Sequence, residues 1–198
     1  MLLFEDKLNA NLLKTPVDQF KTELLKICTE LHINPNDLML VMYNESGINP
    51  ARQNYIKATG LIQWLPNTLK DYNLTPEQVR QMNGIQQLKL VKKYYFAAKG
   101  KLNNVYDLYL YTFYPYALNK PNDYIIGSEK GINYAKLVYE QNKPLGNAKT
   151  GFVTKNSFKE YIYNKYGKLI DKQSGTAINS ALLIIGIIAI SFLIKRFV

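Results

Sequence analysis

Residues 43–68 read YNESGINPARQNYIKATGLIQWLPNT, and the assignment of the fold starts from them. The first of these residues complete a helix that begins at Asn34-Pro35, where asparagine caps the helix and proline takes its first position. Gly47 is expected to end that helix, because glycine readily adopts the left-handed conformation of a helix terminus. The glycine, proline and asparagine residues that follow predict a loop over residues 47–62.

Glu45 closes the apolar face of this helix. Leu38, Val41, Met42 and Glu45 stand at positions i, i+3, i+4 and i+7, which share one side of a helix. A carboxyl group at such a position is expected to be partly buried, and burial raises its pKa towards the range that a general acid needs. The alternative is that Glu45 turns to solvent at a frayed helix end, and the pattern alone leaves both interpretations open.

Signals for helix starts and stops recur through residues 1–172, while strand signals are scarce. The expected capping residues are Thr15, Asn34, Thr75, Ser128 and Thr154. The expected helices cover residues 15–31, 34–47, 84–98, 104–114, 128–141 and 155–166, with a further one that begins at Thr75. The sequence therefore predicts an all-α fold for one helical globular domain over residues 1–172.

The amino-acid composition limits the kinds of catalytic site and binding partner that this chain can have. The 198 residues contain one cysteine, which excludes an intramolecular disulfide framework and a cysteine metal cluster. They contain one histidine, which leaves few of the groups needed for a zinc triad or for Ser-His-Asp catalysis. The net charge is +10, and residues 1–172 hold +8 of it because Lys195 and Arg196 lie beyond them. This charge suits an anionic partner. The lysines are scattered without a nucleic-acid-binding motif, so nucleic acid is not an expected partner.

The last residues have a different composition. Residues 173–194 carry no charge, and residues 177–194 are almost wholly apolar. Eighteen helical residues span roughly 27 Å, close to the hydrocarbon thickness of a bilayer. The expected organisation is a linker at residues 173–176, a single C-terminal transmembrane helix at residues 177–194 that contacts lipid, and a basic tail at residues 195–198. A buried core helix is the alternative.

Residues 43–68 resemble the catalytic signature of the soluble lytic transglycosylase (SLT) domain, a branch of the lysozyme-like superfamily. The matching positions are Glu45-Ser46, Asn49-Pro50, Gly60-Leu61-Ile62-Gln63, Pro66 and Thr68. Weaker similarity to phage-borne members extends from about Phe20 to Tyr166. It includes Gln86-Gln87-Leu88, Tyr94, Asp107-Leu108-Tyr109-Leu110 and Phe113-Tyr114-Pro115.

The resemblance implies a lysozyme-like fold and cleavage of the β-1,4 bond between N-acetylmuramic acid and N-acetylglucosamine in peptidoglycan. Glu45 would be the single acid and base, and the product would carry a 1,6-anhydro end. The N-acetyl group of the sugar would stabilise the intermediate, so neither a second carboxylate nor a cofactor is expected. Ordinary glycosidases, in contrast, use two carboxylates.

Further site residues follow from the same resemblance. Ser46 is expected to orient the carboxylate or the substrate, and Gln63 to reach a sugar; the alternatives are ordinary helix-end polarity for Ser46 and loop stabilisation for Gln63. Gly60 is expected where the backbone turns closely beside the cleft. Where the family commonly has a tyrosine that contacts the catalytic glutamate, this chain has Phe113, so Tyr111 or Tyr114 is expected to supply the hydroxyl.

Residues 145–157 resemble a calcium-loop remnant of some phage relatives. The usual ligand positions hold Gly146, Ala148, Thr150 and Ser157, and none of these offers a carboxylate. Calcium is a hard cation that favours anionic oxygen ligands. We therefore expect no bound metal.

The leading hypothesis is a membrane-anchored lytic transglycosylase of a bacteriophage, located in the virion membrane or the host envelope. It would act in wall penetration or lysis, with peptidoglycan strands and other virion proteins as partners. Two alternatives remain. One is a muramidase, in which water attacks in place of the 6-hydroxyl, and the other is a non-catalytic glycan-binding or structural virion membrane protein.

Overall fold

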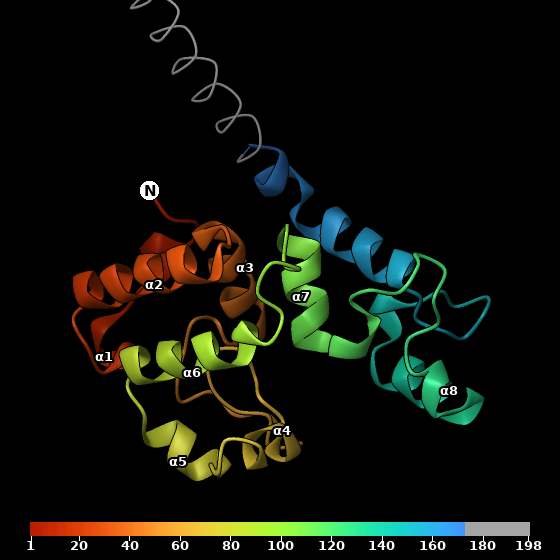
Figure 1. Ribbon diagram of the computed structural model, residues 1–198, viewed down its shortest axis with the longest axis horizontal. Coiled ribbons are helices and arrows are strands. Elements are labelled where there is room, and N and C mark those ends of the chain that lie inside the picture. Colours follow the sequence, from red (N-terminus) through yellow and green to blue (C-terminus); the bar gives the residue numbers. More distant parts are fainter. Residues whose placement is uncertain (173–198) are drawn as a thin grey trace, which may run out of the picture. The chain divides into compact units, whose positions relative to one another are not determined.

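The computed structural model describes residues 1–172 (Figure 1). In this range the regular structure is helical, and the only pairings of β type are isolated bridges. The all-α prediction is therefore confirmed for residues 1–172. No helix within these residues is long and apolar enough to cross a membrane. The predicted linker, transmembrane helix and basic tail lie outside the described residues.

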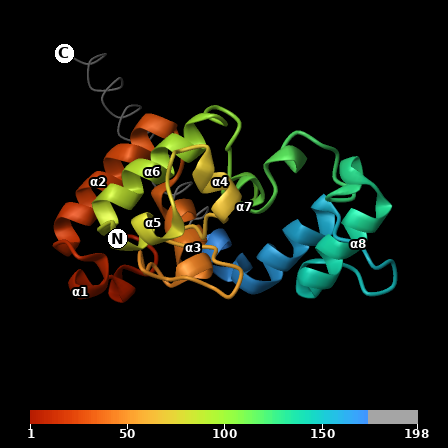
Figure 2. The ribbon, with the colours of Figure 1, turned by 90° about the horizontal axis from the view of Figure 1, so that it is seen from below.

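The chain divides into two compact units, Met1–Asn119 and a second that begins at Lys120. The helices of the first unit are η1 (Glu5–Lys7), α1 (Ala10–Leu13), α2 (Val17–Leu31), α3 (Pro35–Ser46), α4 (Pro66–Lys70), α5 (Pro76–Gln81), α6 (Gly84–Phe96), α7 (Val105–Phe113) and η2 (Pro115–Ala117). Helix α2 packs against α6 and α3, and α3 packs against α7. Perpendicular views show α2 and α6 side by side (Figure 1, Figure 2).

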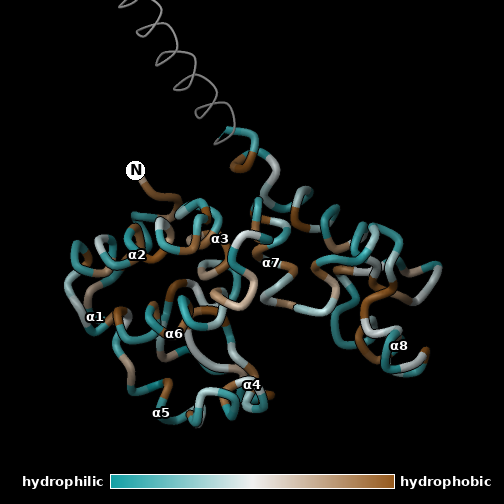
Figure 3. The backbone as a smooth tube through the Cα atoms, in the orientation of Figure 1, coloured by the Kyte–Doolittle hydropathy of each residue, from teal (hydrophilic) through white to brown (hydrophobic). Residues whose placement is uncertain are grey.

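The core of the first unit comes from the apolar faces of these helices. Along α2, hydrophobic and hydrophilic residues follow each other repeatedly (Figure 3), as expected for a helix that buries one side of each turn. The fully buried apolar residues of α2, α3, α6 and α7 include Phe20, Leu24, Leu38, Met42, Leu88, Val91 and Leu110. Their burial holds α3 at the centre of the unit, so its last turn has a defined position.

Several helix termini are where the sequence predicts them. The Asn34 side chain accepts a hydrogen bond from the Asn36 backbone N–H at 2.9 Å, and Gly47 ends α3 with φ +66°. Thr75 and Gln78 form a capping box at the start of α5. A helix over residues 155–172 begins with reciprocal bonds between Thr154 and Ser157, both at 3.0 Å, and runs past its predicted end at 166.

Two predicted caps are wrong. Helix α2 begins one residue later than predicted, because Pro16 has an extended ψ of 137° and takes the N-cap position in place of Thr15. Ser128 instead starts the short helix η3 (Ser128–Lys130). Gly131, with φ +99° and ψ 160°, interrupts the chain before α8 (Ile132–Gln141) begins. The backbone conformation of the next residues therefore decides whether a polar residue caps a helix.

The second unit contains η3, α8, η4 (Lys143–Leu145) and the helix over residues 155–172. Its short bridges join Ile125 to Thr154 and Asn147 to Phe152. The buried residues of this unit include Ile126, Ala135, Val138, Val153, Phe158 and Ile162. It is thus a small unit with a core of its own.

Candidate active site

Glu45 lies in the last turn of α3. Leu38, Val41 and Met42 on the same face are fully buried, while Glu45 is partly buried and partly exposed. The Glu45 carboxylate is close to two tyrosines of α6. Burial is the main cause of the raised pKa of both Tyr94 and Tyr95, and the negative charge of Glu45 adds to it. The end of α3 therefore presents an acid beside two phenols that stay protonated.

Ser46 connects the end of α3 to the glycine-containing loop. Its hydroxyl is buried and donates to the carbonyl oxygens of Met42 and Leu61, each at 3.0 Å. Because the hydroxyl faces backbone groups, this geometry favours a role in positioning the loop over direct contact with a sugar. The sequence offers no signal that identifies Leu61 as the partner of Ser46, and a direct role of Ser46 in orienting the carboxylate or the substrate stays a prediction.

Gly60 occupies a position that no other residue fits without strain. Its φ is +85°, and a Cβ atom built on it would lie 2.6 Å from Gln87 Oε1 and 2.9 Å from the Trp64 ring. Both neighbours are buried. The positive φ and the two crowding side chains explain why glycine stands at this position, and its place beside a substrate cleft stays a prediction.

Gln87 of α6 is a residue whose role sequence reasoning missed. Its side chain is fully buried and accepts a hydrogen bond from the Leu61 N–H at 2.9 Å. The amide nitrogen of Gln87 donates to the carbonyl oxygens of Pro50 at 2.7 Å and Val79 at 2.8 Å. Gln87 therefore holds both ends of the loop that follows α3. The sequence marks it only as part of a family-like segment.

Gln63 also stabilises this loop. It has a positive φ of +53°, and its side-chain nitrogen donates to the carbonyl oxygens of Gly60 at 3.0 Å and Arg52 at 3.2 Å. These bonds match the loop-stabilising alternative. The Gln63 side chain also lines a pocket, and its oxygen has no hydrogen-bond partner within residues 1–172. An N–H group of a ligand could therefore donate to it.

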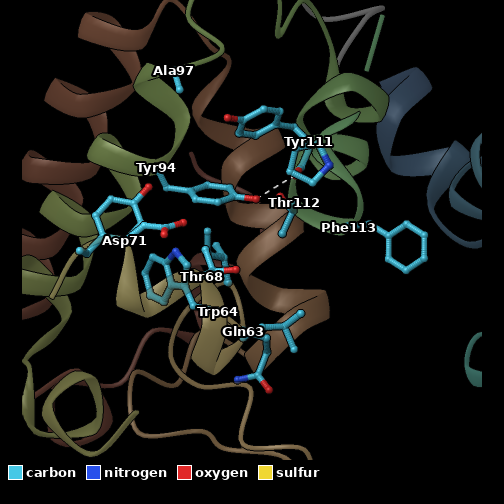
Figure 4. Close-up of a pocket in the computed structure, with 13 residues that line it drawn as sticks. Gln63, Trp64, Thr68, Asp71, Tyr94, Ala97, Tyr111, Thr112 and Phe113 are labelled. Carbon is cyan, nitrogen blue, oxygen red and sulfur yellow. Dashed lines mark hydrogen bonds between the residues drawn. The ribbon is translucent and has the colours of Figure 1, made fainter. Parts of the chain in front are cut away.

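The pocket beside Gln63 has a volume of about 340 Å³ and lies between the loop, α4, α6 and α7 (Figure 4). The Tyr94 hydroxyl donates to the Tyr111 carbonyl oxygen at 2.9 Å, and the two rings lie 5.2 Å apart. Trp64, which has 2 % of its surface exposed, forms part of the wall. Its indole nitrogen is the one buried side-chain nitrogen or oxygen within residues 1–172 that lacks a hydrogen-bond partner.

The two tyrosines predicted to replace the family tyrosine have different surroundings. Tyr111 lines the pocket, and burial raises its pKa. Tyr114 follows the end of α7, with its ring 6.5 Å from that of Phe113, and it is not among the residues that line the pocket. Of the two, Tyr111 is thus the one that a pocket ligand would meet. Contact of either with Glu45 stays a prediction.

The hydroxyl group of Tyr95 donates its proton to a residue of α7. The Thr112 hydroxyl donates to the Leu108 carbonyl oxygen at 2.9 Å, so in its bond with Tyr95 the phenol is the donor. The protons of Tyr94 and Tyr95 are both engaged by α7. Tyr94 and Tyr95 therefore stay uncharged near Glu45. Their hydrogen bonds depend on the packing of α6 against α7.

Metal-binding groups are scarce in the described part of the chain. No three histidine, cysteine, aspartate or glutamate side chains within residues 1–172 lie close enough together to hold a metal ion. Cys28 is buried, and burial together with the charge of Asp37 raises its pKa to about 12. Its thiol therefore stays protonated at neutral pH.

Comparison with known proteins adds one finding to this geometry. Residues 25–118 match the family described as Transglycosylase SLT domain. The match extends from α2 to the residue after η2, so it includes Glu45, Gly60, Gln87 and the pocket. Neither a curated protein nor a solved structure matches the chain.

This match supports the lysozyme-like SLT domain that the motif predicts. At the level of the family, such a domain implies peptidoglycan as substrate and degradation of the lytic transglycosylase type. The helical fold, the glutamate at the end of α3 and the family match all support this class of domain.

Proposed function

We propose that this protein is a peptidoglycan lytic transglycosylase in which Glu45 is the single catalytic acid and base. The observation that carries the proposal is the SLT match over a unit whose motif glutamate is half-buried beside a tyrosine-lined pocket. The bond from Ser46 to the Leu61 carbonyl oxygen supports it further, because it connects the two halves of the motif.

In the proposed reaction, the Glu45 carboxyl group first donates its proton to the glycosidic oxygen between N-acetylmuramic acid and N-acetylglucosamine. The bond from that oxygen to the anomeric carbon then breaks, and the N-acetyl group of the sugar stabilises the intermediate. Next, the Glu45 carboxylate removes the proton of the muramic 6-hydroxyl, whose oxygen bonds to the anomeric carbon. The products are a free N-acetylglucosamine end and a 1,6-anhydro end. Glu45 is protonated again, and no water is consumed.

Asp37, the other acid of α3, is too far away to serve as a second catalytic carboxylate. It precedes Glu45 by eight residues, which corresponds to roughly 12 Å along a helix. The paired carboxylates of ordinary glycosidases are about 5–9.5 Å apart. This spacing excludes Asp37 as a partner of that kind, and the proposal assigns the role of the second group to the substrate. Gly60 and Ser46 are proposed to position the loop, and Gln63 and Tyr111 to contact the sugar.

We also propose a location. The uncharged, apolar residues 177–194 would anchor the protein in the virion membrane of a phage or in the host envelope. There it would open the cell wall during entry or lysis, together with other virion proteins. The support for this part is the composition of that segment and the phage-like motifs.

The test is the clearing of purified peptidoglycan sacculi by the full chain, with mass analysis of the products. The active protein should release fragments with 1,6-anhydro ends, which are one water lighter than hydrolysed fragments. Glu45→Gln should abolish the clearing, while Glu77→Gln, on the exposed side of α5, should leave it unchanged. Ordinary reducing ends would identify a muramidase, and binding of sacculi without cleavage by either form would identify a glycan-binding module.

A further inference from the structure

The pocket between the loop, α4, α6 and α7 has an unusual charge balance. Its walls contain the aromatic rings of Trp64, Tyr72, Tyr94 and Tyr111 and a single acid, Asp71. No lysine, arginine or histidine lines it. The whole chain has 25 lysines and arginines against 15 acids, so a pocket with one acid and no base runs against the general composition.

Asp71, at the C-terminal end of α4, faces this pocket. Figure 4 shows its carboxylate turned towards Tyr94 and Trp64. Within residues 1–172 this carboxylate takes part in no ion pair and no side-chain hydrogen bond. Its negative charge is therefore available to a ligand in the pocket.

The tyrosines show that part of the pocket wall is shielded from water. The pKa values of Tyr72, Tyr94 and Tyr111 are all raised, in each case mainly by burial. For Tyr72, the charges of Tyr111 and Asp71 add to the effect. These rings consequently stay neutral and offer electron-rich faces, which attract cations.

From this arrangement we propose that the pocket binds a primary ammonium group. Asp71 would form the ion pair, and the rings of Tyr72, Tyr94 and Trp64 would contact the cation through their faces. The inference rests on the proposed function for its source of amine, the free side-chain amine of the diamino acid in the peptides attached to N-acetylmuramic acid. The pocket would thereby favour strands whose peptides are not cross-linked through that amine.

The chain contains a direct reporter for this site. Trp64 is its one tryptophan and lines the pocket, so intrinsic fluorescence reports on occupancy. The full chain with Glu45→Gln, which prevents cleavage, would be titrated with the tripeptide N-acetyl-L-Ala-γ-D-Glu-L-Lys, whose side-chain amine is its one ammonium group. The matched probe is the same peptide acetylated on its side-chain amine, and n-butylammonium is a third probe.

The free-amine peptide should change the Trp64 fluorescence and bind about tenfold more tightly than its acetylated form. Asp71→Asn, which keeps the shape of the side chain, should remove this preference. Asp123→Asn, which removes an exposed charge in the second unit, should leave it intact. The Asp71 variant should retain the helical circular dichroism of the parent.

Equal affinity for the two peptides, or a preference that persists in Asp71→Asn, would overturn the proposal. If n-butylammonium binds as tightly as the free-amine peptide, the ammonium site stands and the natural ligand is a free amine. Because binding is measured without turnover, these outcomes are independent of sacculus clearing. If the Glu45→Gln chain shows no preference for the free-amine peptide while the chain with Glu45 intact clears sacculi, this inference alone is rejected.

Discussion

Gly60→Ala tests whether the loop after α3 is held by close packing against α6. The added methyl group would meet Gln87 Oε1 at 2.6 Å and the Trp64 ring at 2.9 Å, and both side chains are buried. Gln87 cannot turn aside without losing its bonds to Leu61, Pro50 and Val79. The backbone also has a φ of +85°, which is unfavourable for alanine.

Gly100→Ala is a matched control for this substitution. Gly100 has a φ of +80°, but no atom lies within 4 Å of its added Cβ. Gly100→Ala should therefore cost only the conformational penalty, about 1–2 kcal/mol in free energy of unfolding. Gly60→Ala adds overpacking of about 1–3 kcal/mol and a weakened bond to the Leu61 N–H. Its total should be about 3–5 kcal/mol.

The assay is urea denaturation of the full chain, followed by Trp64 fluorescence, which reports on the unit that contains both glycines. The free energies of unfolding of the two variants should differ by about 2–3 kcal/mol, because only Gly60 is crowded. Equal losses in both variants would refute the reasoning, since they would leave no effect of Gln87 and Trp64 beyond the backbone penalty. A loss below about 1 kcal/mol for Gly60→Ala would refute it as well.

Two further substitutions test the site and its helix. Ser46→Ala removes the bond to the Leu61 carbonyl oxygen, so it should lower the free energy of unfolding by about 1–2 kcal/mol. It should also reduce kcat more than it changes KM. A variant with unchanged kcat would contradict a positioning role. Asp37 has a pKa raised to about 6 by burial, so the folded state binds more protons than the unfolded state, and stability should fall as pH rises from about 4 to 6. Asp37→Asn should remove that dependence and raise the free energy of unfolding near pH 7 by up to about 3 kcal/mol, as measured by urea denaturation across pH. An unaltered pH profile would show that Asp37 is not its source.

Local signals predicted much of the fold because they act over a few residues. Asn34, Pro35 and Gly47 define α3 through a cap, a fixed φ and a left-handed terminus, and each of these effects is decided by neighbours in the chain. The same reasoning was wrong for Thr15 and Ser128. In both places the backbone torsions of the following residues, which composition does not reveal, decided where the helix begins.

The candidate site was also predictable from the sequence only in part. The motif marks Glu45 and Gly60, while the period of α3 left open whether Glu45 is partly buried or turned to solvent. The role of Gln87 was not predictable, because its hydrogen bonds reach Leu61 and Pro50, which are 26 and 37 residues away. No short-range pattern records such a contact.

The sequence by itself determined the helical class, the ends of α3 and the position of the glutamate, since these depend on spacing and on local backbone preferences. Only the tertiary structure decided that Ser46 and Gln87 both bind the Leu61 backbone, Ser46 at its carbonyl oxygen and Gln87 at its N–H. It also decided that Asp71 and the rings of Trp64, Tyr94 and Tyr111 enclose one pocket. These groups come from separate segments, and the packing of α3, α6 and α7 into a common core brings them together.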